Sequence, residues 1–201
     1  MIAKRLFDLF FSLIGLIILL PVFLILAVLI KWDSKGPVFF RQERMGRFGQ
    51  PFKIHKFRTM TVNTGASGAG GPLITARGDS RITRVGRILR RYKLDELAQL
   101  IDVIMGNMSL VGPRPEVPRY VAYYPDAVRE AVLSVPPGIT DFASIEFKDE
   151  NDMLGLSENP EQEYIKRILP IKLAYYQKYV RERSLWLDFV LILRTIKSIV
   201  F

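Results

Sequence analysis

An uncharged apolar run of 22 residues, Leu9–Ile30, limits what this chain can fold into more than any other feature of its sequence. As a straight helix the run is about 33 Å long, which is enough to cross a bilayer core of roughly 30 Å. A cleavable signal peptide does not fit, because the run is too long and is followed by Lys31-Trp32-Asp33 rather than by a small-residue cleavage site. The run therefore predicts a membrane-embedded helix.

Two membrane topologies stay open for this helix: a kinked spanning helix, and a re-entrant helix that enters and leaves by the same face. Pro21 lies near the middle of the run and removes one backbone hydrogen bond, so it predicts a kink or a break there. Basic residues flank both ends of the run (Lys4, Arg5, Lys31, Lys35). Basic flanks are typical of cytoplasmic ends, and they favour the re-entrant topology.

The rest of the composition narrows the class of function. The chain has no cysteine and one histidine, His55, which argues against thiolate zinc sites, disulfides and a Ser-His-Asp triad. The net charge is +9, and it is concentrated in residues 41–58 (six basic, one acidic) and 77–93 (seven basic, one acidic). This surface predicts an anionic partner, either lipid head groups or a phosphorylated substrate. Nucleic acid is not expected, because no helix-turn-helix, zinc or RNP signature accompanies the charge.

The remaining sequence predicts an α+β, predominantly helical domain over residues 36–201, after a membrane helix region over residues 1–35. Two aromatic runs, 37–42 and 51–58, predict a β-hairpin with a long turn. The glycine-rich stretch 64–72 predicts a loop, and it lacks the Lys-Ser/Thr of a phosphate-binding loop. Helices are expected over 81–91, over 94–105 ending at Gly106, over 117–133 with an interruption near Pro125, over 160–183 with a break at Pro170, and over 185–201.

Asp95 and Glu96 are the first candidate site residues. They stand side by side at an expected helix start, after a run of cations. The alternative is that the two acids only stabilise a helix N-terminus through the helix dipole. That interaction contributes a few tenths to about 1 kcal/mol. Spacing indicates more, because Asp95, Gln99 and Asp102 would share one polar face of a helix. Carboxylates can bind Mg²⁺ or attack phosphorus, and the cations around them can hold phosphates.

Arg114 is the second candidate. Gly112-Pro113-Arg114-Pro115 predicts a rigid turn that presents one arginine. A guanidinium group binds phosphate through two parallel hydrogen bonds, so the turn is a candidate phosphate clamp. A loop with an ordinary surface arginine is the alternative.

Taken together, these motifs resemble the bacterial sugar transferases, the monotopic phosphoglycosyl transferases that act on polyprenol phosphate. The resemblance covers residues 4–140 and is loose beyond them. The matching pieces occur in the family's order: Lys4-Arg5-Leu6-Phe7-Asp8, Gly36-Pro37-Val38-Phe39-Phe40-Arg41-Gln42, Lys56-Phe57-Arg58-Thr59-Met60, Arg81-Ile82-Thr83, Leu94-Asp95-Glu96-Leu97, Gly106, Met108-Ser109, Gly112-Pro113-Arg114-Pro115 and Pro137-Gly138-Ile139-Thr140. Each piece is weak alone, and the set is highly specific.

The resemblance implies a re-entrant helix that is broken at Pro21. It also implies a domain on the cytoplasmic face of the bacterial inner membrane, held there by interfacial amphipathic helices and by contacts with anionic lipids. It implies transfer of a sugar 1-phosphate from a UDP-sugar to undecaprenyl phosphate with Mg²⁺ and release of UMP, the first membrane step of glycoconjugate or polysaccharide assembly. Asp95 corresponds to the nucleophile that forms a covalent phospho-sugar intermediate, and Glu96 to its partner in binding Mg²⁺. Arg90 and Arg114 correspond to phosphate ligands, while Lys56 and Arg58 are expected to line the site.

Four positions depart from the family pattern. Ala98 replaces a frequent Pro and is harmless in a helix. Asp102 replaces a frequent Asn and adds a negative charge close to the expected metal site. Pro136 replaces a basic residue, and Asp141 replaces a Gly at the start of a divergent stretch that we expect to contribute to sugar recognition. The acidic residues of 146–152 face either solvent or an amino-bearing sugar.

Two other functions compete with the transferase: a catalytically inactive membrane scaffold, and a membrane-anchored nucleic-acid binder that rests on the net charge alone. Because the chain starts directly at the Lys4-Arg5 motif, we expect the small form of the family, without a fused preceding domain. The donor sugar, the pathway and the formation of homo-oligomers stay open.

Overall fold

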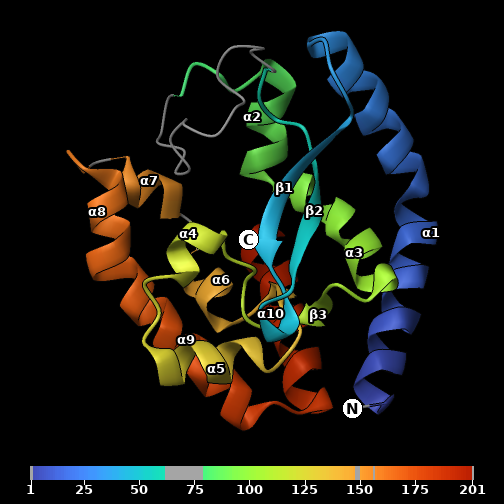
Figure 1. Cartoon of the computed structure of the whole chain (residues 1–201). Coiled ribbons are helices and arrows are strands. Elements are labelled where there is room, and N and C mark those ends of the chain that lie inside the picture. Colours follow the sequence, from blue (N-terminus) through green and yellow to red (C-terminus); the bar gives the residue numbers. More distant parts are fainter. Residues whose placement is uncertain (1, 62–78, 148–149, 156, 201) are drawn as a thin grey trace.

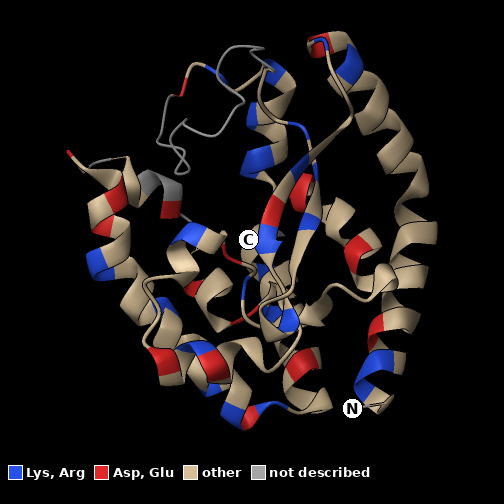
Figure 2. Cartoon of the chain, in the orientation of Figure 1, with Lys and Arg blue, Asp and Glu red and all other residues tan. Residues whose placement is uncertain are grey.

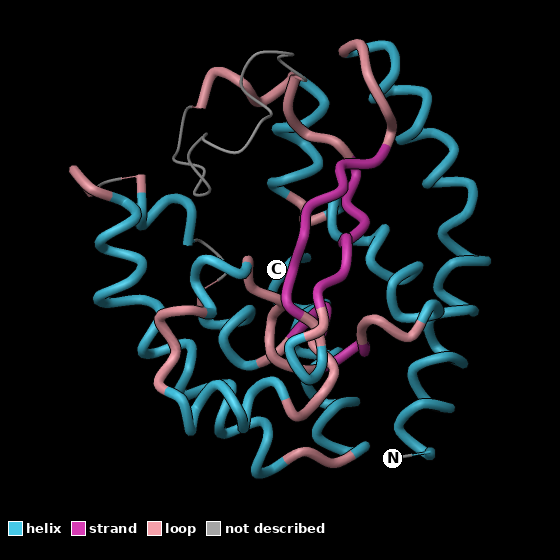
Figure 3. Tube along the Cα trace, in the orientation of Figure 1, coloured by secondary structure: helices cyan, strands magenta, loops and turns pink. Residues whose placement is uncertain are grey.

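The computed structural model describes residues 2–61, 79–147, 150–155 and 157–200. A β-hairpin lies in the middle of the molecule, with α1 and α3 on one side, α8 and α9 on the other, and α2 near its upper end (Figure 1). Figure 3 shows how little of the fold is strand and how much is helix. The expected class, α+β and mostly helical with a long apolar N-terminal helix and a small two-stranded sheet, is confirmed. The expected loop over 64–72 lies outside the described residues.

The hairpin pairs β1 (Phe39–Met45) with β2 (Pro51–Phe57) in antiparallel register through a short 3-10 turn, η1 (Arg47–Gly49). The described helices are α1 (Ile2–Asp33), α2 (Arg84–Arg91), the 3-10 turn η2 (Leu94–Ala98), α3 (Gln99–Met105), α4 (Pro118–Val121), α5 (Asp126–Leu133), α6 (Phe142–Glu146), α7 (Glu150–Leu154), α8 (Pro160–Glu163), the π-helical turn η3 (Tyr164–Ile168), α9 (Leu169–Glu182) and α10 (Leu185–Val200).

Prolines shape two of these helices. The interruption predicted near Pro125 is confirmed, because α4 ends before it and α5 begins after it. Pro170 does not break the C-terminal helix as predicted. It occupies the first turn of α9, and the π-helical turn η3 precedes it. The backbone is already helical at Ile168 and Leu169, so the proline is accommodated within a continuous helical stretch.

A second, unpredicted pair of strands joins β3 (Ser109–Val111) to β4 (Gly138–Thr140) in parallel. Two backbones approach closely here. A Cβ atom on Gly138 would lie 2.0 Å from the backbone nitrogen of Gly112, so only glycine fits. Gly112 donates to the carbonyl of Thr140 (3.0 Å), and Gly138 donates to that of Pro113 (2.9 Å). These bonds hold the Gly112–Pro115 turn at the end of β3.

Helix α1 packs one narrow stripe against the domain and leaves its other faces uncovered. The buried residues of the helix are spaced by three, four or eleven positions, which places them on one face: Asp8, Ser12, Phe23, Leu26 and Ile30. It is the one helix of the described chain that is long and apolar enough to cross a membrane, and only 17% of its most apolar window is buried. Figure 2 shows that its charged residues lie near its two ends. The core helix of a soluble protein would be mostly buried, so this exposure supports membrane association.

Both ends of α1 are tied to the domain by polar contacts. At the N-terminal end, Arg5 donates to the carbonyls of Val103 (2.5 Å) and Ile104 (2.9 Å) at the end of α3. Lys4 lies 2.9 Å from Asp8 of its own helix and 2.9 Å from Asp188 of α10.

At the C-terminal end, Asp33 accepts a hydrogen bond of 2.8 Å from the backbone of Val85 in α2. Arg58 donates to the carbonyls of Ile30 (3.2 Å), Ser34 (2.7 Å) and Lys35 (2.7 Å). The last carbonyls of a helix have no partner within the helix, so the guanidinium of Arg58 caps α1.

Pro21 lies inside α1 and the helix continues through it without interruption. The expected break at Pro21 is therefore not seen, and the re-entrant path stays a prediction.

We expect Arg58→Ala to lower the free energy of unfolding by about 3 kcal/mol, because three carbonyls at the end of α1 lose a charged donor. Arg58→Lys should recover part of the loss. Thermal or denaturant unfolding of the detergent-solubilised chain measures both. The matched control is Lys35→Ala, which removes an exposed cation at the same end of α1 and should change stability by no more than about 0.5 kcal/mol. Equal stability of Arg58→Ala and the control would contradict the capping role.

Candidate active site

The candidate site is built on the 3-10 turn η2, which carries Asp95 and Glu96. Lys93 precedes the turn in the left-handed conformation (φ 54°), which is rare for a residue with a side chain. Residues in such conformations concentrate at functional sites. The turn packs against α1, because Leu94, Leu97 and Ala98 lie in one apolar cluster with the buried residues of that helix. Apolar residues of the turn thus face the membrane helix, while its two acids face away from that packing.

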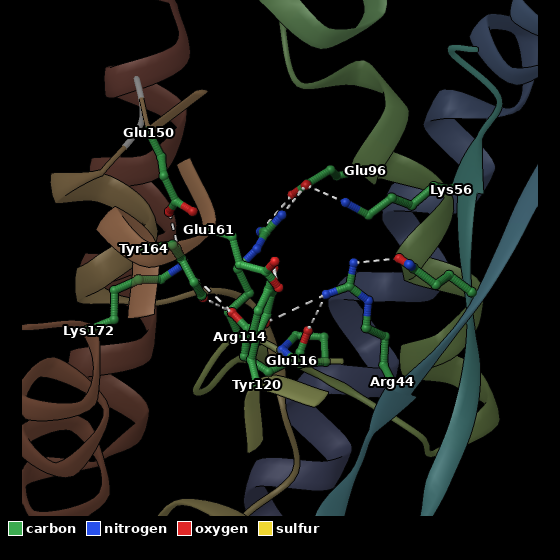
Figure 4. A network of polar contacts seen from close by, with 12 residues as sticks. Arg44, Lys56, Glu96, Arg114, Glu116, Tyr120, Glu150, Glu161, Tyr164 and Lys172 are labelled. Atoms are coloured by element: carbon green, nitrogen blue, oxygen red, sulfur yellow. Dashed lines mark hydrogen bonds and ion pairs between the residues drawn. The ribbon is translucent and has the colours of Figure 1, made fainter. Parts of the chain in front are cut away.

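Glu96 joins three segments that are distant in the sequence. Its Oε1 accepts from Lys56 Nζ of β2 at 2.7 Å and from Arg114 Nη2 at 2.5 Å, and its Oε2 accepts from Arg114 Nη1 at 3.1 Å. Figure 4 shows Arg114 and Lys56 reaching this carboxylate from different directions. Burial alone would raise the pKa of Glu96, but the two cations hold it well below its usual range.

Asp95 lies next to Glu96 and in a different environment. Its side chain is partly buried, and its carboxylate has no hydrogen bond or ion pair with another residue of the described chain. Burial raises its pKa; the charge on Glu96 adds to this shift, while Lys56, Arg90 and Lys93 oppose it. Two adjacent carboxyl groups with pKa shifts in opposite directions are typical of sites that give each acid its own task.

Arg90 of α2 is the second predicted cation near Asp95. Its Nε donates to Thr59 Oγ1 at 2.9 Å, and burial lowers the pKa of the guanidinium while Asp95 raises it. The Thr59 carbonyl also accepts from the backbone of Thr83, the N-cap of α2 (3.0 Å). A Cβ atom at Gly86 would lie 2.1 Å from that carbonyl oxygen, so glycine lets α2 approach closely. Thr59 therefore positions Arg90, a role that the sequence analysis did not assign although Thr59 belongs to a matching motif.

The structure brings together Asp95, Glu96, Lys56, Arg90 and Arg114 and leaves out Arg58. Alternation along an extended strand would place Lys56 and Arg58 on the same face, but Arg58 lies beyond the end of β2 at Phe57 and does not follow the alternation. The side chain of Arg58 is 3% exposed and is engaged at the end of α1. We therefore do not include Arg58 among the residues of the candidate site.

Asp102 does not face the site either, contrary to the expected polar face with Asp95 and Gln99. The residues at Asp95 form a 3-10 turn, and the α-helix begins only at Gln99, so the spacing does not place them on one α-helical face. Asp102 is fully buried and accepts from the backbone nitrogen (2.8 Å) and Nδ1 (2.7 Å) of His55 in β2. His55 Nε2 lies 2.6 Å from Arg41 Nη1, so it is the acceptor of that bond and the proton is on Nδ1. Asp102 therefore holds the strand that carries Lys56.

A second polar cluster lies beside Arg114 and was not predicted (Figure 4). Glu116 Oε1 accepts a short hydrogen bond from Tyr164 and lies 3.7 Å from Lys172 Nζ, which is 3% exposed and also bonds Glu150 at 2.9 Å. Arg44 donates to the Pro115 carbonyl at 3.1 Å. The only sequence signal for this cluster is that Glu116 directly follows the Gly112–Pro115 turn.

The divergent residues have mixed placements. Asp141 is buried and caps α6 by accepting from the backbone of Ser144 at 2.6 Å, which is a structural role. Glu150 belongs to the expected acidic stretch and joins the second cluster, and it also raises the pKa of Arg114 after the larger effect of Glu96. Residues 148 and 149 of that stretch lie outside the described residues.

The chemistry of this group suits a phosphorylated ligand. Three cations, Lys56, Arg90 and Arg114, surround two carboxylates. No group of three or more His, Cys, Asp or Glu side chains that could hold a metal ion occurs within the described ranges. Mg²⁺ is commonly bound by one or two carboxylates together with substrate phosphates, so Asp95 and Glu96 fit a cation that arrives with a diphosphate.

Comparison with known proteins agrees with this chemistry. The family model "Bacterial sugar transferase" matches residues 1–201. A UDP-glucose:undecaprenyl-phosphate glucose-1-phosphate transferase of Caulobacter vibrioides is 37% identical over 202 residues, which cover 98% of this chain and 70% of that protein. A protein of the same description from Klebsiella pneumoniae is 39% identical over 98% of this chain and 40% of its own length. An Aeromonas hydrophila UDP-N-acetylgalactosamine-undecaprenyl-phosphate N-acetylgalactosaminephosphotransferase is 35% identical over 98% of this chain and 43% of its own length. The chain thus spans about two fifths of the length of the latter two relatives.

The contact between Asp102 and His55 yields a prediction about stability. Asp102→Ala leaves two buried donors of His55 without an acceptor, and we expect the free energy of unfolding to fall by about 3 kcal/mol. Asp102→Asn keeps an acceptor for the backbone nitrogen and should cost less. The side-chain amide of this variant would then donate to Nδ1 of His55. That bond requires the ring proton to be on Nε2, the nitrogen that faces Arg41. Because His55 is the only histidine, its ring nitrogen signals in ¹⁵N NMR report the tautomer directly. An unchanged tautomer in Asp102→Asn would contradict this geometry.

Proposed function

Because the chain belongs to the bacterial sugar transferase family, we propose that it transfers a sugar 1-phosphate from a UDP-sugar to undecaprenyl phosphate and releases UMP. The relatives carry names of this activity with glucose or N-acetylgalactosamine as the sugar, and the family model covers the chain from end to end. The donor sugar of this chain is therefore to be sought first among these two.

One observation carries the proposal: Asp95 and Glu96 are adjacent, yet only Glu96 is bonded to protein cations. Glu96 is held ionised by Lys56 and Arg114, while the carboxylate of Asp95 is free to approach a ligand. A carboxylate can serve as a covalent nucleophile toward phosphorus. The three cations reduce the repulsion between a diphosphate and an anionic carboxylate, so that the carboxylate can come close to it.

The reaction we propose has two displacements at one phosphorus atom. An oxygen of Asp95 attacks the β-phosphorus of the UDP-sugar, the bond from that phosphorus to the bridging oxygen breaks, and UMP leaves with that oxygen. A phosphate oxygen of undecaprenyl phosphate then attacks the same phosphorus, and the bond to Asp95 breaks. Both attacking oxygens are already ionised, so neither step requires a general base. The water-soluble donor and the lipid acceptor use the site in turn.

Arg114 and Arg90 bind the donor phosphates in this proposal, and Lys56 stabilises the charge between the two acids. Asp95 and Glu96 would hold Mg²⁺, which supplies further neutralisation of the diphosphate when it is bound. Thr59 keeps Arg90 in place, and Asp102 keeps β2 in place through His55.

The packing of α1 supports a monotopic placement at the cytoplasmic face of the inner membrane. Its two ends are tied to the same domain, at Arg5 and at Asp33, so a straight path across the bilayer would carry parts of that domain with it. We propose that both ends stay on one side, with Pro21 at the turning point of a re-entrant path. Exposed apolar residues on α2 (Ile88, 57% exposed) and α10 (Trp186, 73% exposed) suit contacts with the interface. The exposed cations Arg84 and Arg87 of α2 suit anionic lipids.

The first test is UMP release by the full chain in nanodiscs with Mg²⁺, with UDP-glucose and UDP-N-acetylgalactosamine as donors. We expect turnover that requires undecaprenyl phosphate and that falls at least about a thousandfold in Asp95→Asn, the scale for loss of a covalent nucleophile. Asp126→Asn removes an exposed acid from α5 and is the matched control. Chelation of divalent cations should also stop turnover.

The covalent step has its own readout. Without the lipid acceptor, the wild-type chain should release no more than one UMP per molecule and gain the mass of a sugar phosphate, and Asp95→Asn should do neither. Transfer without such an adduct would overturn the two-step mechanism. A folded chain that gives no UMP from any donor would instead favour the inactive scaffold.

The pKa shifts give a second prediction, on the pH dependence of the rate. Asp95 must be ionised to attack, and burial raises its pKa above the ordinary 3.8, so kcat/KM should fall with decreasing pH at a higher pH than an ordinary aspartate would give. Lys56 opposes that shift, so Lys56→Met should move the acid limb to still higher pH. Lys53→Met, at an exposed position of the same strand, should leave the limb in place. An acid limb at the same pH in Lys56→Met and Lys53→Met would show that Lys56 does not affect the ionisation of Asp95.

A further inference from the structure

A cavity of about 610 Å³ lies at the N-terminal end of α1. Five parts of the chain line it: the start of α1, the hairpin turn at Arg47, the segment from Gly106 to Val111, the two residues Val135 and Pro136 before β4, and the corner between α9 and α10. None of the residues assigned to the donor site lines it. Its volume is in the range of small-ligand sites, and nothing in the proposed reaction uses it.

The polar part of its lining is predominantly cationic. Four basic side chains and two acidic ones line the cavity: Lys4, Arg5, Arg47, Arg183, Asp8 and Asp188. Lys4 forms ion pairs with both Asp8 and Asp188. Its positive charge offsets much of the negative charge that these two acids would present to a ligand. The N-terminal end of α10, capped by Ser184, also lines the cavity, and its helix dipole adds positive potential. The cavity therefore favours an anionic group.

Arg183 is the cation best placed to meet such a group. Its side chain is exposed, and it has no hydrogen bond or ion pair with another residue in the part of the chain that the structure describes. The other cations already have protein partners; Arg5, for instance, donates to the end of α3 and Arg47 donates to the Ser134 carbonyl at 2.9 Å.

The rest of the cavity and its surroundings are apolar. Ile2, Met108, Val135 and Leu185 contribute to the lining. Close by in the chain, Leu6 of α1 and Trp186 of α10 expose most of their side chains. A small hydrated anion gains nothing from such walls, whereas a molecule with an anionic head and an apolar tail uses both parts. Basic pockets beside membrane helices are typical binding sites for anionic lipid head groups.

We propose that this cavity binds the head group of an anionic phospholipid, with an acyl chain along the exposed apolar side of α1. The bound lipid contacts the start of α1 and the start of α10 together, so it reinforces the junction made by Lys4 and Asp188. This site is separate from the one for undecaprenyl phosphate beside Asp95. The proposal rests on the membrane association of α1, and it does not depend on the reaction assigned to Asp95.

The absence of cysteine makes a direct test feasible. Ala3→Cys places one thiol in the lining of the cavity, and Ala127→Cys places one at an exposed position of α5 as the matched control. The full chain in neutral detergent is alkylated by an uncharged maleimide while short-chain phosphatidylglycerol is titrated in. We expect saturable, several-fold slowing at Ala3→Cys and no change at Ala127→Cys. Phosphatidylcholine with the same chains and inorganic phosphate should give no protection.

Arg183→Gln in the Ala3→Cys background should weaken the apparent affinity for phosphatidylglycerol about fivefold, the effect of one cation near an anionic lipid. Arg181→Gln removes an equally exposed cation from α9, outside the lining, and should leave the affinity unchanged. Circular dichroism verifies that each variant is folded. Equal protection by phosphatidylcholine, equal protection by inorganic phosphate, protection at both cysteines, or an Arg183→Gln variant that binds like the parent would each overturn the proposal.

Discussion

The carboxylate of Glu96 is the interaction on which the arrangement of this site depends. It accepts from Lys56 of the hairpin and from Arg114 of the turn after β3, and it belongs to the 3-10 turn between α2 and α3. Removing one partner of such a largely buried ion pair typically costs about 3–5 kcal/mol, because the remaining charge is left without a partner. The pair therefore fixes where the three segments meet. It also leaves Asp95 beside three cations without engaging its carboxylate, as the nucleophile role proposed for Asp95 requires.

Helix α1 connects that site to the membrane. The residues that follow Asp95 and Glu96 in the turn, Leu97 and Ala98, pack with Phe23 and Leu26 on the buried stripe of α1. The depth of the site is thus set by the same helix whose other faces are apolar and exposed. Polar contacts hold both ends of the helix, so its position relative to the domain is determined along its whole length. The proposed lipid phosphate acceptor would require this coupling, because its reactive group lies at the membrane surface.

Sequence reasoning succeeded where a local pattern carries the information. The uncharged run predicts the long helix, the aromatic runs predict the hairpin, and the spacing of apolar residues predicts most of the other helices, since each pattern reflects the period of one element. It also named Asp95, Glu96, Lys56, Arg90 and Arg114 as candidate site residues; the structure places these side chains near one another, and their roles stay predictions. It missed β3 and β4, because three-residue strands show no period and pair across 26 intervening residues. It misjudged Pro170, because the π-helical turn before it cannot be read from composition.

What the sequence by itself determined is the kind of protein this is: a membrane-associated, mostly helical domain with a basic surface, a pair of adjacent acids and a turn that presents one arginine. Only the tertiary structure decided what each charged side chain does. Lys56 and Arg58 are two residues apart, yet one bonds Glu96 and the other caps α1. Asp95 and Asp102 are seven residues apart, about two turns of an α-helix, yet the carboxylate of Asp95 has no bonded partner in the described chain and Asp102 is buried against His55. The residue type determines which bonds a side chain can form. Its actual partner depends on which segments lie next to it, and packing between distant parts of the chain determines which segments those are.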